Sequence, residues 1–147
     1  DAMCDLRQGN FQGAMQKLAT LLQNNPSDTF TKLVYAQSRM KLPLLRSNYE
    51  LRKTKKLIEE VLLDQPNSSR AHLLLGNIYV LRDDMANAVE AFHTCLKLDP
   101  NNKLALQNAL LALQKTNAWD AYDDIVAIGM KLTPNHPLLK NRNRAQE

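Results

Sequence analysis

Apolar residues recur every three or four positions along most of the chain, which is the spacing of one face of an α-helix. Between 69 and 102 this pattern occurs twice, in "SRAHLLLGNIYVLR" and in "MANAVEAFHTCLKL", with Asp83-Asp84 between the two segments. Aspartates favour helix N-termini, because their carboxylates accept hydrogen bonds from free backbone N–H groups. The pattern therefore predicts two amphipathic helices joined by a short turn.

A proline-centred phrase repeats at a regular interval. Pro66, Pro100 and Pro134 lie 34 residues apart in "LLDQPNS", "LKLDPNN" and "MKLTPNH", and Pro26 in "LQNNPSD" adds a fourth phrase. Since proline cannot continue a helix, each phrase marks the end of one helix and the start of another. Two facing helices bury only part of their apolar surface, so successive pairs must stack. We expect an all-α fold, an antiparallel helix-hairpin solenoid.

The helix pair at 69–102 closely resembles a tetratricopeptide repeat (TPR). The matching positions are Ala71, Leu75, Gly76, Asn77, Tyr79, Ala88, Phe92, Leu96, Leu98 and Asp99-Pro100-Asn101-Asn102. In such a repeat Gly76 and Ala88 are small because two helices cross closely there, and Tyr79 and Phe92 fill the space beside them. His72 stands where the family usually has Trp, and we expect it to pack between helices.

The rest of the chain follows the same phase less regularly. We divide it into a partial repeat at 1–28, a repeat with an insertion at 29–68, the regular repeat at 69–102, a repeat at 103–136 and the start of a capping helix at 137–147. The insertion lies around "KLPLLRSNY", where Pro43 prevents simple helix continuation. The resemblance implies a single right-handed TPR solenoid of about three full repeats with partial ones at its ends. Those ends lack polar caps, so we expect a fragment or self-association through the end repeats.

Composition and charge narrow the choice of partner. Of the 147 residues, 44% are hydrophobic and 5% aromatic, which predicts an aliphatic core. No apolar run is long enough to span a membrane, which disfavours membrane insertion by this segment. The formal charge is +4, and most of the excess lies between Arg39 and Lys56. A cytoplasmic location and a bacterial periplasmic or membrane-anchored one are both compatible with this composition.

Candidate chemistry is sparse in the sequence. His72, His93 and His136 have no carboxylates or thiols at metal-ligand spacing, and Cys4 and Cys95 are best interpreted as small buried apolar residues. The sequence has no nucleophile motif and no glycine-rich phosphate loop. We therefore expect no enzymatic activity, no metal and no cofactor.

The resemblance implies a protein-binding scaffold, because the first helix of each pair lines the concave side of such a stack. By position, the expected partner-binding residues are Phe30, Leu33, Val34, Gln37, Arg70, Leu73, Leu74, Asn77, Gln107, Asn108 and Leu111. Leucines would hold apolar side chains of a peptide or helix, and amides would pair with its backbone. We expect Leu73 and Asn77 to lie outside the stacking contacts. Some family members bind a C-terminal carboxylate through Lys, Asn and Arg. Those positions hold Leu33, Gln37, Leu74, Leu104 and Asn108 here, so we do not expect that activity.

Three roles stay open. The repeat with an insertion is similar to TPR proteins of bacterial assembly or biogenesis complexes, of the cytochrome c maturation or pilus type. Alternatively, a basic patch of Arg46, Arg52, Lys53, Lys55 and Lys56 would bind an acidic protein tail, an anionic lipid or a nucleic acid. The simpler interpretation is the solvated face of a helix, and few aromatic residues accompany the charges, which disfavours nucleic acid. The third role is a regulatory domain of a larger enzyme.

Overall fold

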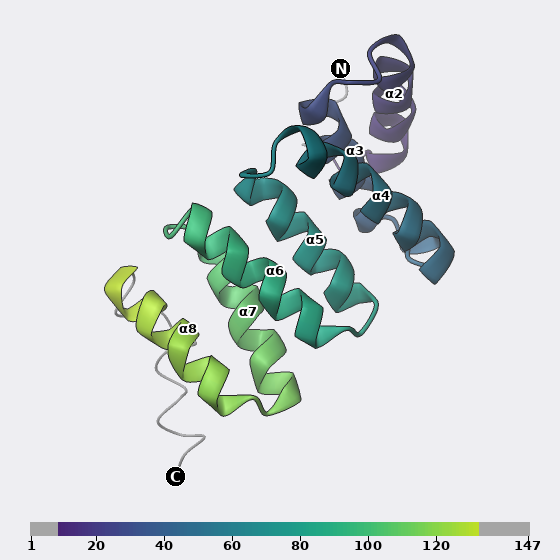
Figure 1. Cartoon of the computed structure of the whole chain (residues 1–147). Coiled ribbons are helices and arrows are strands. Elements are labelled where there is room, and N and C mark those ends of the chain that lie inside the picture. The colour runs from purple at the N-terminus through teal and green to yellow at the C-terminus, as the bar shows by residue number, and fades with distance from the viewer. Residues whose placement is uncertain (1–8, 133–147) are drawn as a thin grey trace.

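The computed structural model describes residues 9–132, which form seven α-helices and one 3-10 helix, with no strand in that range (Figure 1). The helices are α2 (Phe11–Asn24), α3 (Thr29–Lys41), α4 (Asn48–Asp64), α5 (Ser69–Leu81), α6 (Met85–Leu98), α7 (Lys103–Thr116) and α8 (Trp119–Leu132), and the 3-10 helix η1 (Pro43–Leu45) lies between α3 and α4. The predicted all-α helix-hairpin solenoid is confirmed. Residues 1–8 and 133–147, with the expected capping helix at 137–147, lie outside the described residues.

The helices are arranged in a row of antiparallel pairs. Each helix packs against the next one along the chain, and α5 also contacts both α3 and α7 (Figure 1). The first helices of successive pairs therefore lie side by side and form one face of the stack. None of the helices within 9–132 is long and apolar enough to cross a membrane.

Short polar side chains begin most of the helices. Each of these N-cap side chains accepts a hydrogen bond from the backbone N–H three residues later: Asn10 in α2, Asp28 in α3, Ser47 in α4, Ser68 in α5, Asp84 in α6 and Asn102 in α7. The interpretation of Asp83-Asp84 as a helix start is correct for Asp84. Asp83 instead takes a left-handed backbone conformation, with φ at 59°, and so completes the turn.

Two of these caps make stability depend on pH. A hydrogen bond from Thr31 Oγ1 to Asp28 Oδ2, at 2.5 Å, lowers the pKa of Asp28. A bond of 2.7 Å from Asn87 Nδ2 to Asp84 Oδ2 lowers the pKa of Asp84 in the same way. Because both folded-state pKa values lie below the unfolded ones, the stabilisation is present above about pH 4 and is lost as the pH falls through the folded values.

Replacing both aspartates with asparagine should flatten this dependence, since asparagine caps a helix about as well without titrating. Between pH 5 and pH 2 the melting temperature of the Asp28→Asn/Asp84→Asn variant should fall less steeply than that of the parent. Thermal melts followed by circular dichroism at several pH values measure both slopes. Parallel slopes in the two proteins would show that these caps do not titrate as argued.

The core consists of two main hydrophobic clusters that share α5. The N-terminal cluster is formed by buried residues of α3, α4 and α5, namely Leu33, Ala36, Met40, Leu51, Ile58, Val61, Ala71, Leu74 and Ile78. The C-terminal cluster runs from α5 to α8 and contains Leu73, Ala88, Phe92, Cys95, Leu96, Ala105, Leu106, Ala109, Leu110, Leu113, Tyr122, Ile125 and Val126. Helix α5 therefore buries one side of its surface in each cluster.

The helix crossing at Gly76 follows the expected pattern. A Cβ atom at Gly76 would lie 2.6 Å from Cδ1 and 2.9 Å from Cζ of the fully buried Phe92 ring, so only glycine fits without displacement. Cys95 is buried as expected, whereas Cys4 lies outside the described residues. His72 is only partly buried, and its packing between helices stays a prediction. Its Nε2 lies 3.1 Å from the carbonyl oxygen of Pro66, on the preceding turn, where the ring stays partly exposed.

The insertion between α3 and α4 is fastened by two arginines. Arg39 is buried, donates from Nε to Thr54 Oγ1 at 2.9 Å and forms an ion pair with Glu50, which joins α3 to α4. Arg46 follows η1, and its Nε donates to the carbonyl oxygen of Met40 at 2.8 Å. The second bond turns the insertion back toward the C-terminal end of α3.

Candidate protein-binding groove

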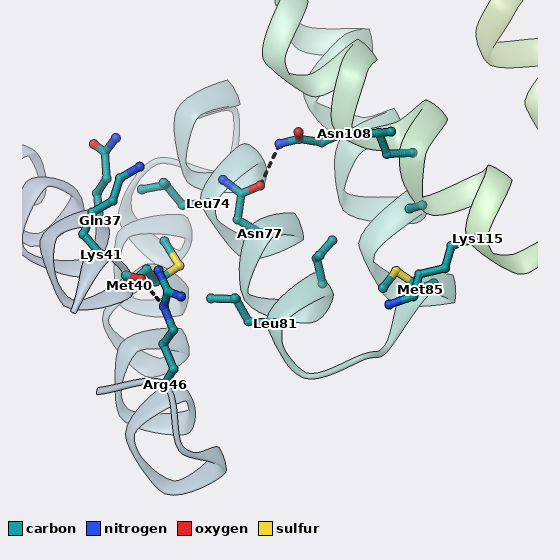
Figure 2. Close-up of a pocket in the computed structure, with 13 residues that line it drawn as sticks. Gln37, Met40, Lys41, Arg46, Leu74, Asn77, Leu81, Met85, Asn108 and Lys115 are labelled. Carbon is teal, nitrogen blue, oxygen red and sulfur yellow. Dashed lines mark hydrogen bonds between the residues drawn. The ribbon is translucent and has the colours of Figure 1, made fainter. Parts of the chain in front are cut away.

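A cavity of about 360 Å³ opens on the face formed by α3, α5 and α7, and we call it the α3/α5/α7 groove (Figure 2). Its lining comes from three successive helix pairs and from the insertion. The residues are Gln37, Met40 and Lys41 of α3, Arg46 after η1, Leu74, Asn77, Val80 and Leu81 of α5, Met85 of α6, and Asn108, Leu111, Ala112 and Lys115 of α7. The volume lies within the range of roughly 300–1,000 Å³ that is usual for binding pockets.

Helical periodicity explains why these side chains share one face. Asn77, Val80 and Leu81 are spaced by three and four residues, as are the lining residues of α3 and those of α7. Each of the three helices contributes an amide and, one turn later, at least one apolar residue: Met40 on α3, Val80 and Leu81 on α5, and Leu111 and Ala112 on α7. The groove is thus an apolar strip with an amide on each helix.

The amides are held by hydrogen bonds. Asn108 Nδ2 donates to Asn77 Oδ1 at 2.9 Å and so joins α7 to α5 across the groove (Figure 2). Gln37 Oε1 accepts from Arg70 at 2.9 Å, and the Arg70 guanidinium lies over the Phe30 ring. Because an amide has both donors and an acceptor, Asn77 and Asn108 each keep a polar group for a partner.

The structure divides the sequence-predicted binding residues into three sets. Gln37, Leu74, Asn77, Asn108 and Leu111 line the groove. Phe30, Arg70 and Gln107 are exposed but lie outside its lining.

Leu33, Val34 and Leu73 form the third set, because they are buried in the core. The expectation that Leu73 lies outside the stacking contacts is wrong: it is only 9% exposed and belongs to the C-terminal cluster. The physical reason is that α5 has a neighbouring pair on both sides, so residues flanking its exposed face are covered as well. Leu74 is also buried, within the N-terminal cluster, yet it forms part of the groove floor.

Several lining residues were absent from the sequence prediction. They are Met40, Lys41, Val80, Leu81, Met85, Ala112 and Lys115. The signal for most of them was the helical period itself, since extending the Gln37 and Asn77 faces by one turn reaches Met40, Lys41, Val80 and Leu81. Met85 carried no such signal, because it enters the groove from the start of α6.

The cations of the predicted basic patch differ in their surroundings. Arg46 lines the groove, whereas Lys55 Nζ lies 3.5 Å from Glu59 Oε1 and above the Tyr79 ring. Lys53 lies beside Glu50 and over the ring of Tyr49. Arg52 and Lys56 are exposed on α4. Arg46 therefore differs from the four cations of α4 because it lines the groove, and binding of an acidic partner by those four stays a prediction.

Reactive groups are few in the part of the chain that the structure describes. There, no three His, Cys, Asp or Glu side chains are grouped so that they could hold a metal ion. Burial, with a smaller contribution from Asp99, raises the pKa of the Cys95 thiol to about 11. Because the thiolate is the nucleophilic form, burial and the raised pKa both disfavour nucleophilic chemistry at this cysteine near neutral pH.

Comparisons with known proteins agree on the fold. Residues 69–102 match the family model described as tetratricopeptide repeat. A crystal structure of MamA has 15% identity and a TM-score of 0.80, covering 99% of this chain and 84% of that chain. TTC0263, a thermophilic TPR protein in Thermus thermophilus, has 16% identity and a TM-score of 0.76, covering 98% of this chain and 76% of that chain.

A third similar structure is that of Naa15/Naa10 bound to HypK-THB. It has 15% identity and a TM-score of 0.75, covering 99% of this chain but only 22% of that chain. The comparison with curated proteins found no match. At such identities the structural likeness shows the fold alone.

Proposed function

We propose, from the premise that the chain is a tetratricopeptide-repeat protein, that it is a non-catalytic scaffold whose α3/α5/α7 groove binds a peptide or helix of a partner protein. Proteins of this fold typically serve as protein–protein interaction scaffolds. The observation that carries the proposal is the groove itself, an apolar strip that continues across three helix pairs and has amides along it.

Exposed leucines support this assignment. Leu81 is 40% exposed and Leu111 is 46% exposed, and both lie in the lining of the groove. Covering a leucine side chain completely contributes roughly 1.5–3 kcal/mol. Because both leucines are already more than half buried, a partner that covers the rest gains roughly half of that figure from each residue.

The groove suits a peptide or a helix rather than a small ligand. Its amides, Gln37, Asn77 and Asn108, come from three different helices, so they can contact an elongated partner at three points along the groove. Amide side chains can pair with the backbone of an extended segment or with the polar side chains of a helix. A role within a larger assembly fits this arrangement, and a setting in cytochrome c maturation or pilus assembly stays a prediction.

Truncating the two exposed leucines tests the proposal. The Leu81→Ala/Leu111→Ala variant should bind the partner with a free energy less favourable by roughly 2 kcal/mol or more, the loss expected when hot-spot residues are truncated. The partner is first recovered by cross-linking in the source organism, and calorimetric titration then gives both affinities. The matched control is Leu44→Ala/Leu63→Ala, because those leucines are 92% and 85% exposed and lie outside the groove lining. Equal affinity of the parent and the groove variant would place the binding site elsewhere.

A further inference from the structure

The positively charged residues of the groove indicate the charge of its occupant. Lys41, Arg46 and Lys115 belong to its lining, and within the described residues no Asp or Glu lines it. Figure 2 shows Lys41 and Arg46 on the α3 side of the groove and Lys115 on the α7 side. The apolar strip is therefore flanked by positive charge at both edges.

The insertion fixes one of these cations in place. The bond from Arg46 Nε to the Met40 carbonyl oxygen, at 2.8 Å, holds the guanidinium beside the groove and leaves its two terminal nitrogens for other acceptors. A guanidinium presents paired N–H donors that match a carboxylate in a two-bond geometry. Lys41, the last residue of α3, lies on the same edge and adds a second charge.

Among residues 9–132, neither Lys41 nor Arg46 forms an ion pair with an acid. Glu50, the acid nearest to the insertion along the chain, forms an ion pair with the buried Arg39. On the opposite edge, Lys115 Nζ lies 3.3 Å from Asp83 Oδ1, but both side chains are largely exposed. Exposed pairs of this kind contribute little, so Asp83 competes weakly with another carboxylate and Lys41 and Arg46 are the stronger anchor.

We infer that the occupant of the α3/α5/α7 groove is an amphipathic segment of a partner protein whose apolar residues cover Leu81 and Leu111 and whose acidic side chains pair with Lys41 and Arg46. The inference rests on the proposed function and adds the chemistry of the partner. The pairing is strengthened because Met40 and Leu74 beside it exclude water once the groove is filled. The acids are side chains within the segment, so a free chain end is not required.

A peptide selection supplies a defined probe. Random 12-residue peptides are displayed against the full chain, and those that also bind the Leu81→Ala/Leu111→Ala variant are removed. Selected sequences are synthesised with amidated C-termini, so that every carboxylate belongs to a side chain. Each is paired with a version in which Asp and Glu are replaced by Asn and Gln, and fluorescence anisotropy gives the affinities.

Selected peptides should be enriched in Asp and Glu next to apolar residues. The amide versions should bind the parent protein about tenfold or more weakly than the selected peptides do. The selected peptides should bind the Lys41→Gln/Arg46→Gln variant more weakly by a similar factor, because both changes remove close charge pairs at the interface. The control variant Arg52→Gln/Lys56→Gln removes two exposed charges outside the groove and should change affinity less than about twofold. The single variant Lys41→Gln leaves the Arg46 bond intact and should show part of the loss.

The other outcomes separate the two claims. If no peptide distinguishes the parent from the leucine variant, the proposed function fails and the inference fails with it. If groove-dependent peptides lack acids, or bind the Lys41→Gln/Arg46→Gln variant as tightly as the parent, the groove stays a binding site and the acidic partner is refuted. An equal loss in the Arg52→Gln/Lys56→Gln variant would refute it too, because the effect would then be one of overall charge.

Discussion

Replacing Gly76 with alanine should destabilise the protein by about 2 kcal/mol, in the usual range for an overpacked core. This expectation runs against helix propensity, since alanine is favoured over glycine inside a helix by roughly 0.5–1 kcal/mol. The added methyl group would fall within 2.6 Å of Phe92 Cδ1, and the ring cannot move outward because it is fully buried between α5 and α6. Chemical denaturation followed by circular dichroism gives the change in free energy of unfolding.

The matched test removes the ring rather than the glycine. In a Phe92→Leu background two of the nearby ring atoms, Cε1 and Cζ, are absent, so Gly76→Ala should cost much less or become stabilising. A coupling energy of about 1 kcal/mol or more between the two positions is expected for residues in direct contact. An unchanged penalty in both backgrounds would mean that the glycine is required for another reason.

Replacing Arg39 with alanine should also destabilise the protein strongly, by about 2–3 kcal/mol. Removing one partner of a buried ion pair usually costs about 3–5 kcal/mol, and Glu50 keeps some solvent contact, which reduces the loss. The change also removes the Arg39 Nε–H group, which donates to Oγ1 of the buried Thr54. The companion variant Arg39→Met/Glu50→Gln removes both charges and should recover part of the stability, because no unpaired charge is left behind.

Arg52→Ala and Lys56→Ala are the controls for Arg39, since both side chains are exposed on α4. Each should change the free energy of unfolding by less than about 0.5 kcal/mol, as exposed positions usually do. Urea denaturation of all four variants gives the comparison. A loss at Arg39 no larger than at these two positions would show that the ion pair between α3 and α4 does not stabilise the fold.

Local sequence signals were sufficient for the fold. The interval between Pro66 and Pro100 marked one complete repeat, and Gly76 with Phe92 identified the crossing inside it. Ser68 and Asp84 mark helix starts through short-range hydrogen bonds, which do not depend on the rest of the molecule. Such features can be read from a few residues, because the interactions behind them are local.

The site depended on contacts that are not local. Leu73 and Leu74 are adjacent and chemically identical, and only the packing of α5 between its neighbours decides which one reaches the groove. Charge alone likewise did not separate Arg39, which is buried against Glu50, from Arg46, which lines the groove. The path of the insertion after Pro43 decides that difference, and a single sequence contains no signal for that path.

The sharing of α5 between the two hydrophobic clusters has a consequence for cooperativity. A linear array whose cores were separate would melt in stages from its ends, because each repeat interacts only with its neighbours. Here one helix inserts Leu73 into one cluster and Leu74 and Ile78 into the other, which couples the melting of the two halves. Leu74 also lies under the groove, so a ligand bound there is linked by mass action to the stability of the whole array rather than to that of one repeat.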